Sequence, residues 1–133
     1  MFGLWYGKGP GLDRALDAIR HANMGGVAKY GGMVLAVGDD ATGKSSTLAY
    51  QSEQTFIAAG VPFFYPRSIH AIIPMGLQAF ALSRLAGCCV GMKIVVDTAD
   101  ASSIIDLDRI RPEITAIIEQ ISTLPPPIDM ADE

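Results

Sequence analysis

The stretch Met33-Val34-Leu35-Ala36-Val37, followed by Gly38-Asp39-Asp40, decides how the rest of the chain is interpreted. Five apolar residues in a row are typical of a short strand that is buried on both faces of a sheet. The glycine and the two carboxylates cannot continue such a strand, so a polar loop is expected over 38–46. The stretch therefore predicts a buried strand that ends in a pair of aspartates.

The segments around this strand alternate between helical and extended patterns. Apolar residues at helical spacing, together with glycine or proline at the ends, predict helices at 12–24, 47–59, 68–86 and 109–122. Short apolar runs predict two more strands, at 61–65 and 89–96. This alternation predicts an α/β fold with a parallel sheet and crossover helices. Ligands of such sheets bind at the carboxyl ends of the strands, where the loops 38–46 and 97–103 are expected.

The two ends of the chain are expected to lie outside the packed unit. Residues 1–11 contain four glycines and one proline, which predicts a loop and not a first strand. Leu124 is followed by three prolines and then by acidic residues, so regular structure is expected to stop there. We therefore divide the chain into a partial α/β domain over 1–123 and a Pro-rich acidic tail over 124–133.

Composition narrows the class of protein. Half of the 133 residues are hydrophobic and the formal net charge is −4, which argues against a disordered chain and against a nucleic-acid partner. Cys88 and Cys89 are adjacent, which disfavours a disulfide between them and suits a reducing compartment. No leader pattern is recognisable, and the most apolar stretch, 71–82, is too short to span a bilayer. We expect a cytoplasmic protein without a membrane partner.

Residues 38–45 match the phosphate-loop pattern GxxxxGK[ST] of nucleotide triphosphatases. In such a loop, backbone N–H groups surround the phosphates, Lys44 would reach the β- and γ-phosphates, and Ser45 would bind Mg²⁺. Asp97, at the end of an apolar run, resembles the acid of a second metal-binding motif. However, Asp100 stands where a GTPase has a glycine, and no guanine-reading NKxD motif follows. A phosphate-loop nucleotide-binding protein remains an alternative.

Other segments carry a resemblance to a family. In chain order they are Trp5–Arg14, His21-Ala22-Asn23, Gly31–Asp40, Lys44-Ser45-Ser46-Thr47, Gln51-Ser52-Glu53, Ala81–Cys88 and Lys93–Thr98. Together they resemble the indolepyruvate ferredoxin oxidoreductases, which are thiamine-diphosphate-dependent 2-oxoacid:ferredoxin oxidoreductases. The resemblance covers residues 2–106, and the chain departs from the family pattern from Leu107 onward. The family pattern does not need Gly43, so the phosphate-loop match is accidental on this interpretation.

The resemblance implies a fold, a cofactor and partners. The stretch would be part of the domain that binds the aminopyrimidine ring of thiamine diphosphate, a partial thiamine-diphosphate-binding fold of the pyrimidine type. The activating glutamate would lie upstream, the diphosphate and Mg²⁺ in a separate domain, and the iron–sulfur clusters elsewhere. The complete enzyme would decarboxylate an indolepyruvate-like 2-oxoacid, transfer the acyl group to coenzyme A and reduce ferredoxin. Its other domains or subunits would be the partners, and the chain alone should be inactive.

Eight residues are candidates for a position near cofactor or substrate: Lys8, Asp39, Asp40, Lys44, Ser45, Ser46, Gln51 and Glu53. The aspartate pair either orients a loop or a water, or simply caps backbone N–H groups. Lys8 lies in a glycine-rich loop that resembles an anion cradle but equally suits a flexible connection. No catalytic residue is assigned, and no metal ligand is predicted within the chain.

The remaining candidates lie on the helix that is expected after the first strand. Residues 44–46 are expected to open a helix, and their backbone N–H groups, with the lysine side chain, would suit the carboxylate of a 2-oxoacid. An ordinary helix cap with an exposed lysine is the alternative. Gln51 and Glu53 are two positions apart and cannot share a helix face, so at most one is expected to point into the site.

A third interpretation is a non-catalytic assembly module. The apolar content is high for a domain of this size, and part of the apolar surface is expected to face another domain or subunit. This interpretation predicts dimers or higher oligomers in solution, and we expect a homo-oligomer in any case.

Overall fold

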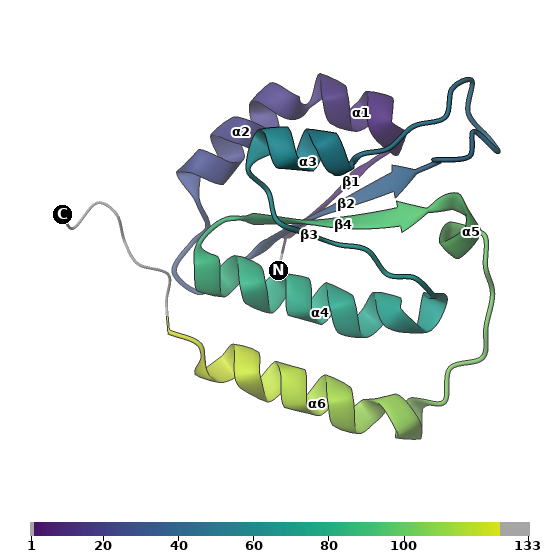
Figure 1. Ribbon diagram of the computed structural model, residues 1–133. Helices are drawn as coiled ribbons and strands as arrows, with labels where there is room; N and C mark the ends of the chain where they lie inside the picture. The colour runs from purple at the N-terminus through teal and green to yellow at the C-terminus, as the bar shows by residue number, and fades with distance from the viewer. Residues whose placement is uncertain (1, 126–133) are drawn as a thin grey trace.

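Four parallel strands form one sheet in the order β1-β2-β4-β3. The computed structural model describes residues 2–125, and its strands are β1 (Phe2–Tyr6), β2 (Met33–Asp39), β3 (Phe63–Phe64) and β4 (Cys89–Val95) (Figure 1). Because all neighbouring strands are parallel, each connection has to cross over the sheet. The predicted α/β fold with a parallel sheet and crossover helices is confirmed.

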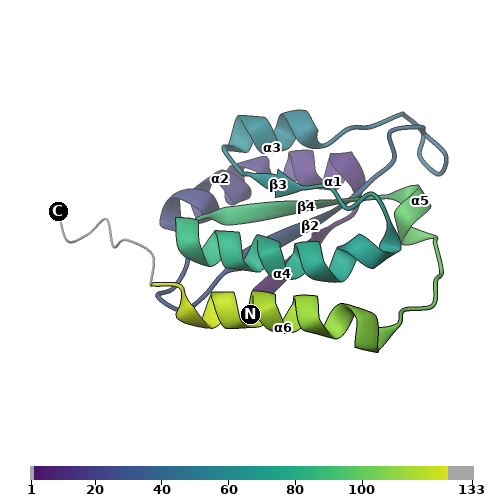
Figure 2. The same cartoon turned by 60° about the horizontal axis from the view of Figure 1, so that its bottom comes forward.

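Helices cover both faces of the sheet. On one face lie α1 (Lys8–Arg14), α2 (Leu16–Gly25) and α3 (Glu53–Ala59), and on the other lies α4 (Ile69–Ala86) (Figures 1 and 2). A hydrophobic core cluster fills the first of these interfaces and contains Leu12, Ile19, Leu35, Val37, Phe56, Ala59, Val61 and Cys89. The short helix α5 (Val96–Ala99) follows β4 directly, and α6 (Leu107–Thr123) packs against α4.

The two central strands differ in how completely they are buried. Six of the seven residues of β4 are buried, as expected for an interior parallel strand. In β2 the burial alternates: Leu35 and Val37 are buried under α1 and α2, whereas Val34 and Ala36 are only half-buried. The prediction that 33–37 is buried on both faces is therefore right for one face only.

The prediction of a loop over 1–11 is wrong. Phe2–Tyr6 forms the edge strand β1 and pairs with β2 in register, from Phe2 opposite Met33 to Tyr6 opposite Val37. The glycines had suggested a loop, but the neighbouring strand offers this backbone a complete ladder of hydrogen bonds. A helix then begins at Lys8, earlier than the predicted start at 12, and the predicted helix over 12–24 is two helices that meet at Ala15.

The predicted helix over 47–59 is also shorter than expected. Only Glu53–Ala59 is helical, and the segment before it is a loop. The carboxylate of Asp39 accepts hydrogen bonds from the backbone N–H and the hydroxyl of Ser52, at 2.8 and 2.9 Å. The chain is thereby held against the sheet just before the helix, and local propensity is overridden by this tertiary contact.

The predicted helices at 68–86 and 109–122 and the predicted strand at 89–96 agree with α4, α6 and β4 within two residues. The predicted strand over 61–65 is reduced to the two residues of β3, and α5 lies at the start of the predicted loop 97–103. The prediction that the apolar stretch at 71–82 is too short to span a bilayer is wrong on length, because this stretch belongs to α4, which has 18 residues and includes Pro74. By length and composition alone, α4 is apolar enough to cross a membrane, a property that core helices of other proteins share. Here it packs between the sheet and α6. Of the predicted tail, residues 126–133 lie outside the described part of the chain.

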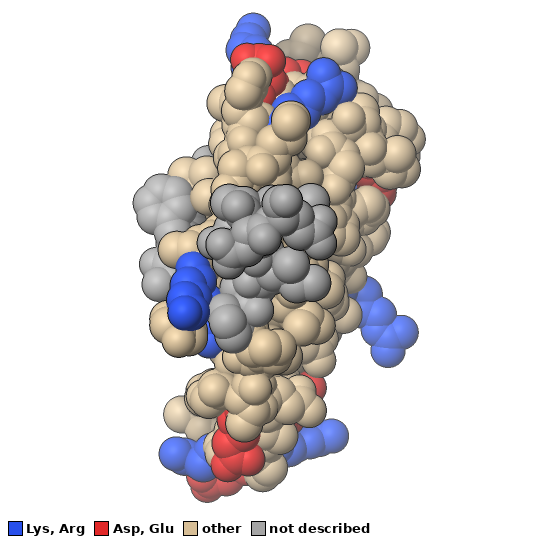
Figure 3. Space-filling model, turned by 90° about the vertical axis from the view of Figure 1, so that its left-hand side faces the viewer, with Lys and Arg blue, Asp and Glu red and all other residues tan. Residues whose placement is uncertain are grey.

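The two cysteines are unpaired, and the charges on one face of the molecule are mixed in sign (Figure 3). Cys88 and Cys89 are both free thiols. On the face drawn in Figure 3, acidic and basic side chains are interspersed and do not gather into one patch of either sign.

Candidate functional site

Three connections meet at the carboxyl edge of the sheet. β1 ends next to Lys8, β2 ends in the aspartate pair, and β4 runs into α5 with Asp97. Parallel strands bring their carboxyl ends to one edge, which is why residues that are 37 to 53 positions apart contact one another here. The two loops that were expected at this edge, 38–46 and 97–103, are joined by an ion pair between Lys44 and Asp97, 3.0 Å apart.

Asp40 closes the loop that follows β2. Its side chain is fully buried, and its two carboxylate oxygens accept the backbone N–H groups of Lys44 at 2.8 Å and of Ser45 at 2.7 Å. Its carbonyl oxygen accepts the N–H groups of Gly43 and Tyr50. The hydrogen bonds from Ser45 and Lys44 hold the pKa of Asp40 well below its usual range. Asp40 is therefore a charged anchor on which the loop folds back.

Lys8 fastens the same loop from the other side. Its ammonium donates to the carbonyl oxygen of Ser45 at 2.7 Å, to the hydroxyl of Ser45 at 2.8 Å and to the hydroxyl of Ser46 at 2.6 Å. A carboxylate oxygen of Asp40 lies 3.5 Å from the same nitrogen. An ammonium has three N–H donors, and all three are engaged within the chain. In this conformation Lys8 has no free donor for an anion.

A cluster of three charged side chains, two of them buried, lies beside this loop. The ammonium of Lys93 lies 3.1 Å from a carboxylate oxygen of Asp39 and 2.5 Å from one of Glu53, and it also lies over the ring of Tyr65. Burial lowers the pKa of Lys93, but the hydrogen bonds to Glu53 and Asp39 raise it more, so the net shift is upward. The cluster ties the ends of β2 and β4 to the start of α3.

The cluster has a surplus negative charge. Two carboxylates face one ammonium, and Asp39 is the better satisfied of the two, since it also accepts hydrogen bonds from Ser52 and from the N–H of Asp40. One oxygen of Glu53 is buried and has no hydrogen-bond partner among the described residues. Lys93 was missed as a site residue in the sequence. The sequence does show a single lysine inside the apolar run 89–95. A lysine in a buried strand is normally paired with an acidic partner, so this position could have been recognised as part of a charged site.

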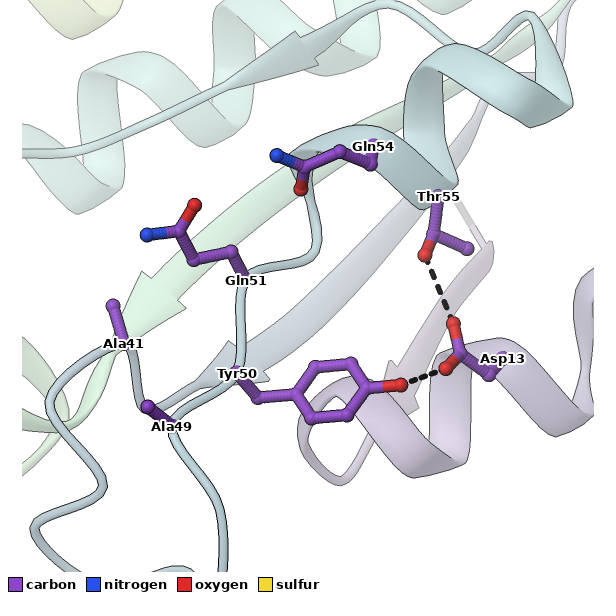
Figure 4. Close-up of a pocket in the computed structure, with 7 residues that line it drawn as sticks. All are labelled: Asp13, Ala41, Ala49, Tyr50, Gln51, Gln54 and Thr55. Carbon is purple, nitrogen blue, oxygen red and sulfur yellow. Dashed lines mark hydrogen bonds between the residues drawn. The ribbon is translucent and has the colours of Figure 1, made fainter.

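Two hollows flank the loop, and Tyr50 lines both. The first, of about 460 Å³, is lined by Asp13, Ala41, Ala49, Tyr50, Gln51, Gln54 and Thr55 (Figure 4). The hydroxyls of Tyr50 and Thr55 donate to the two carboxylate oxygens of Asp13, and the carboxamides of Gln51 and Gln54 point away from them. The second hollow, of about 330 Å³, is lined by Gly7, Lys8, Pro10, Ser45, Ser46, Thr47, Leu48 and Tyr50.

The structure separates the eight predicted site residues into three groups. Six of them belong to the two charged clusters at the carboxyl edge: Lys8, Asp39, Asp40, Ser45, Ser46 and Glu53. Lys44 pairs with Asp97, and this hydrogen bond raises the pKa of Lys44. Gln51 lies before the helix and lines the first hollow, whereas Glu53 turns inward to Lys93. Only one of these last two reaches the charged clusters.

One part of the site prediction is wrong. Residues 44–46 do not open a helix, because α3 begins only at Glu53. The N–H groups of Lys44 and Ser45, which would have met a ligand carboxylate or a phosphate, donate to Asp40 instead. A phosphate loop uses these same N–H groups and leads directly into a helix. The local geometry therefore does not favour the phosphate-loop alternative.

The described residues offer no cage for a metal ion. No group of three or more His, Cys, Asp or Glu side chains in this part of the chain could hold one. Among the described residues that line the two hollows, the side-chain polar groups of Gln51, Gln54 and Thr47 remain for a ligand. These groups suit hydrogen bonds to an uncharged ligand better than they suit a diphosphate.

No family model, curated protein or solved structure matches this chain. The likeness to the 2-oxoacid oxidoreductases therefore stays a resemblance carried by short segments. A function has to be argued from the residues at the carboxyl edge.

Proposed function

We propose that this chain is part of a thiamine-diphosphate-dependent 2-oxoacid:ferredoxin oxidoreductase, in which it forms one wall of the site for the aminopyrimidine ring. One observation carries the proposal: segments that carry the resemblance are also bonded to one another. Lys8 of the first segment binds Ser45 and Ser46, and Glu53 of a later segment binds Lys93 of the last one. The residues that carry the resemblance are therefore neighbours at one edge of the sheet, as one wall of a shared site requires.

The charges at this edge fit the ring of the cofactor better than its diphosphate. A bound diphosphate calls for free cations or a metal ion, and both lysines of the loops are already engaged, Lys8 with serines and Lys44 with Asp97. Carboxamides can both donate to and accept from the edge of an uncharged heteroaromatic ring. Gln51 and Gln54 are the groups of this chain that would meet the ring, and the diphosphate would be held outside the chain.

The bonded residues would act by holding this wall in place. Thiamine diphosphate itself supplies the nucleophilic carbon and the electron sink for decarboxylation of a 2-oxoacid. The cluster of Asp39, Lys93 and Glu53 fixes the start of α3, and with it the direction of Gln54. Asp40 fixes both ends of the loop that carries Lys44 and Ser45. Rigid support of this kind is what a cofactor site requires.

The proposal is tested on the assembly that contains the chain. A tagged form is purified from the cells that make it, and reduction of ferredoxin by 2-oxoacids is measured with and without thiamine diphosphate and coenzyme A. We expect activity that depends on both, with aryl-type 2-oxoacids among the substrates. If no assembly that contains the chain shows thiamine-dependent activity, the assignment is wrong.

The same assay on the 133-residue chain alone tests the expected division of labour. We expect no turnover, because the resemblance places the activating glutamate and the diphosphate site in other parts of the enzyme. Decarboxylation by the purified chain alone would contradict this expectation, even if the assembly is active.

A separate observation favours assembly with other domains or subunits. Helix α4 is mostly apolar, and only 22% of its residues are fully buried between the sheet and α6. Ile73 and Leu85 on this helix are exposed. Helices that are apolar on all sides are normally covered. We propose that α4 contacts another domain or subunit, and light scattering of the chain should detect dimers or larger species if a second copy is that partner.

A further inference from the structure

Lys8 has an unusual backbone conformation. Its φ angle is +59°, and among the described residues it is the only non-glycine residue with positive φ. Glycine adopts this left-handed conformation without strain, and glycine stands on both sides of the lysine. A side chain is kept at this position against its conformational preference, which points to a use for that side chain.

The side chain of Lys8 binds a segment that is distant along the chain. Its ammonium holds three oxygens of Ser45 and Ser46, which are 37 and 38 residues away along the chain. These serines lie in the middle of segment 41–50, which we call the strap. The two ends of the strap are fixed by the carbonyl oxygen of Asp40, through the N–H groups of Gly43 and Tyr50. Most strap residues between these two points are exposed. Besides the carboxylate of Asp40 and the ion pair of Lys44 with Asp97, the contacts of Lys8 are what hold this part of the strap in place.

The strap separates the two hollows of the site. Strap residues line both of them, and Tyr50 belongs to both linings. Protonation of Asp40 would not release the strap near neutral pH, because the N–H groups of Ser45 and Lys44 hold its pKa far below that range. The ammonium of Lys8 is partly exposed and lies at the edge of the second hollow. Its contacts with the strap are therefore the ones that can open while the sheet stays folded.

We propose that Lys8 is a positioning residue that locks the strap, residues 41–50, over the carboxyl edge of the sheet. Its backbone strain is offset by the bonds that the ammonium makes to Ser45 and Ser46. Without it, the strap opens while the sheet stays folded, and the wall between the two hollows is lost. The inference does not depend on the proposed function, since it concerns only contacts within this chain.

Hydrogen exchange of the full 133-residue chain tests the lock. Lys8→Gly removes the ammonium and the strain together, and Lys8→Met removes the ammonium alone. Lys29→Met, which changes an exposed lysine outside the strap, is the matched control. In both Lys8 variants we expect the N–H groups of Lys44 and Ser45 to exchange at least about tenfold faster, because a network of bonds to a charged group is lost. The N–H groups of β4 should keep their protection.

The stability of the Lys8→Gly variant separates a lock from an ordinary structural residue. Relief of the strained φ should leave the urea midpoint unchanged or higher, even though the strap has opened. Unchanged exchange at Lys44 and Ser45, or equal acceleration in the strap and in β4, would overturn the proposal. If Lys8→Met does not fold, Ser46→Ala replaces it, and at least about threefold faster exchange in the strap is then expected; unchanged exchange would again overturn it.

Discussion

The ammonium of Lys93, inside the buried strand β4, lies 3.1 Å from the carboxylate of Asp39 at the end of β2. Both side chains are almost completely buried, and Glu53 is a second acidic partner of the same lysine. Buried ion pairs add little net stability over apolar residues, but removal of one partner leaves the other charge without compensation. Removal of Lys93 should therefore have a large, measurable effect on stability.

We expect Lys93→Met to destabilise the chain by about 3–5 kcal/mol, because the buried carboxylate of Asp39 and the half-buried carboxylate of Glu53 then lose their cation. Urea unfolding followed by circular dichroism measures the change in the free energy of unfolding. Lys29→Met, at an exposed position, is the control and should change it by less than about 0.5 kcal/mol. A loss below about 1 kcal/mol for Lys93→Met would mean that the carboxylates are not held as the structure has them.

The lowered pKa of Asp40 predicts how the free energy of unfolding changes as the pH falls. The usual pKa of an aspartate is 3.8, and the N–H groups of Ser45 and Lys44 lower that of Asp40 in the folded state. The unfolded chain therefore takes up this proton first as the pH falls. The stability that Asp40 contributes is fully present above its unfolded pKa and is lost as the pH falls toward its folded pKa.

Asp40→Asn should consequently lower the urea midpoint at pH 7 and flatten its decline between about pH 5 and about pH 2. The asparagine keeps one acceptor oxygen but places an amide group against a backbone N–H. Asp108→Asn, at an exposed carboxylate, is the control and should leave the whole profile in place. An Asp40→Asn profile that is parallel to that of the wild type would contradict the clamp at Asp40.

Gly9 tests the packing between α1 and the strap. A Cβ atom at Gly9 would overlap the ring of Tyr50, whereas one at Gly7 would meet nothing within 4 Å. We expect Gly9→Ala to cost about 1–3 kcal/mol, since the ring has to leave its place. Gly7→Ala should change the free energy of unfolding far less. Equal effects of the two substitutions in urea unfolding would show that Tyr50 does not rest on Gly9.

The parts of the fold that could be predicted are those in which the apolar pattern and the packing agree. The run Met33–Val37 and the run starting at Cys89 form strands because both are long enough and apolar enough to lie inside a parallel sheet. β1 was missed because its glycines suggest a loop, and only the neighbouring strand β2 supplies the hydrogen bonds that make it a strand. Pairing between distant segments leaves no local signal.

The candidate site, too, could be predicted from the sequence only in part. The aspartate pair could be placed at the strand end from the sequence, because polar residues after a buried run mark the carboxyl edge. What these carboxylates bind could not be predicted, since Asp40 takes the backbone N–H groups of Lys44 and Ser45 that had been assigned to a ligand. Lys93 was also missed, because a lysine in a strand is normally solvated and its two acidic partners come from other elements.

Calorimetric titration with Mg²⁺–ATP and Mg²⁺–GTP distinguishes the proposed function from the phosphate-loop alternative. We expect no binding, because a phosphate would have to displace the carboxylate of Asp40 from the N–H groups of Lys44 and Ser45, and the two negative charges repel each other. Lys44→Ala is the control, since a phosphate loop loses its affinity without that lysine. Micromolar binding by the wild type that is lost in Lys44→Ala would contradict the proposed function and make this a nucleotide-binding protein. Absence of binding in both removes that alternative and leaves the oxidoreductase assembly as the next preparation to assay.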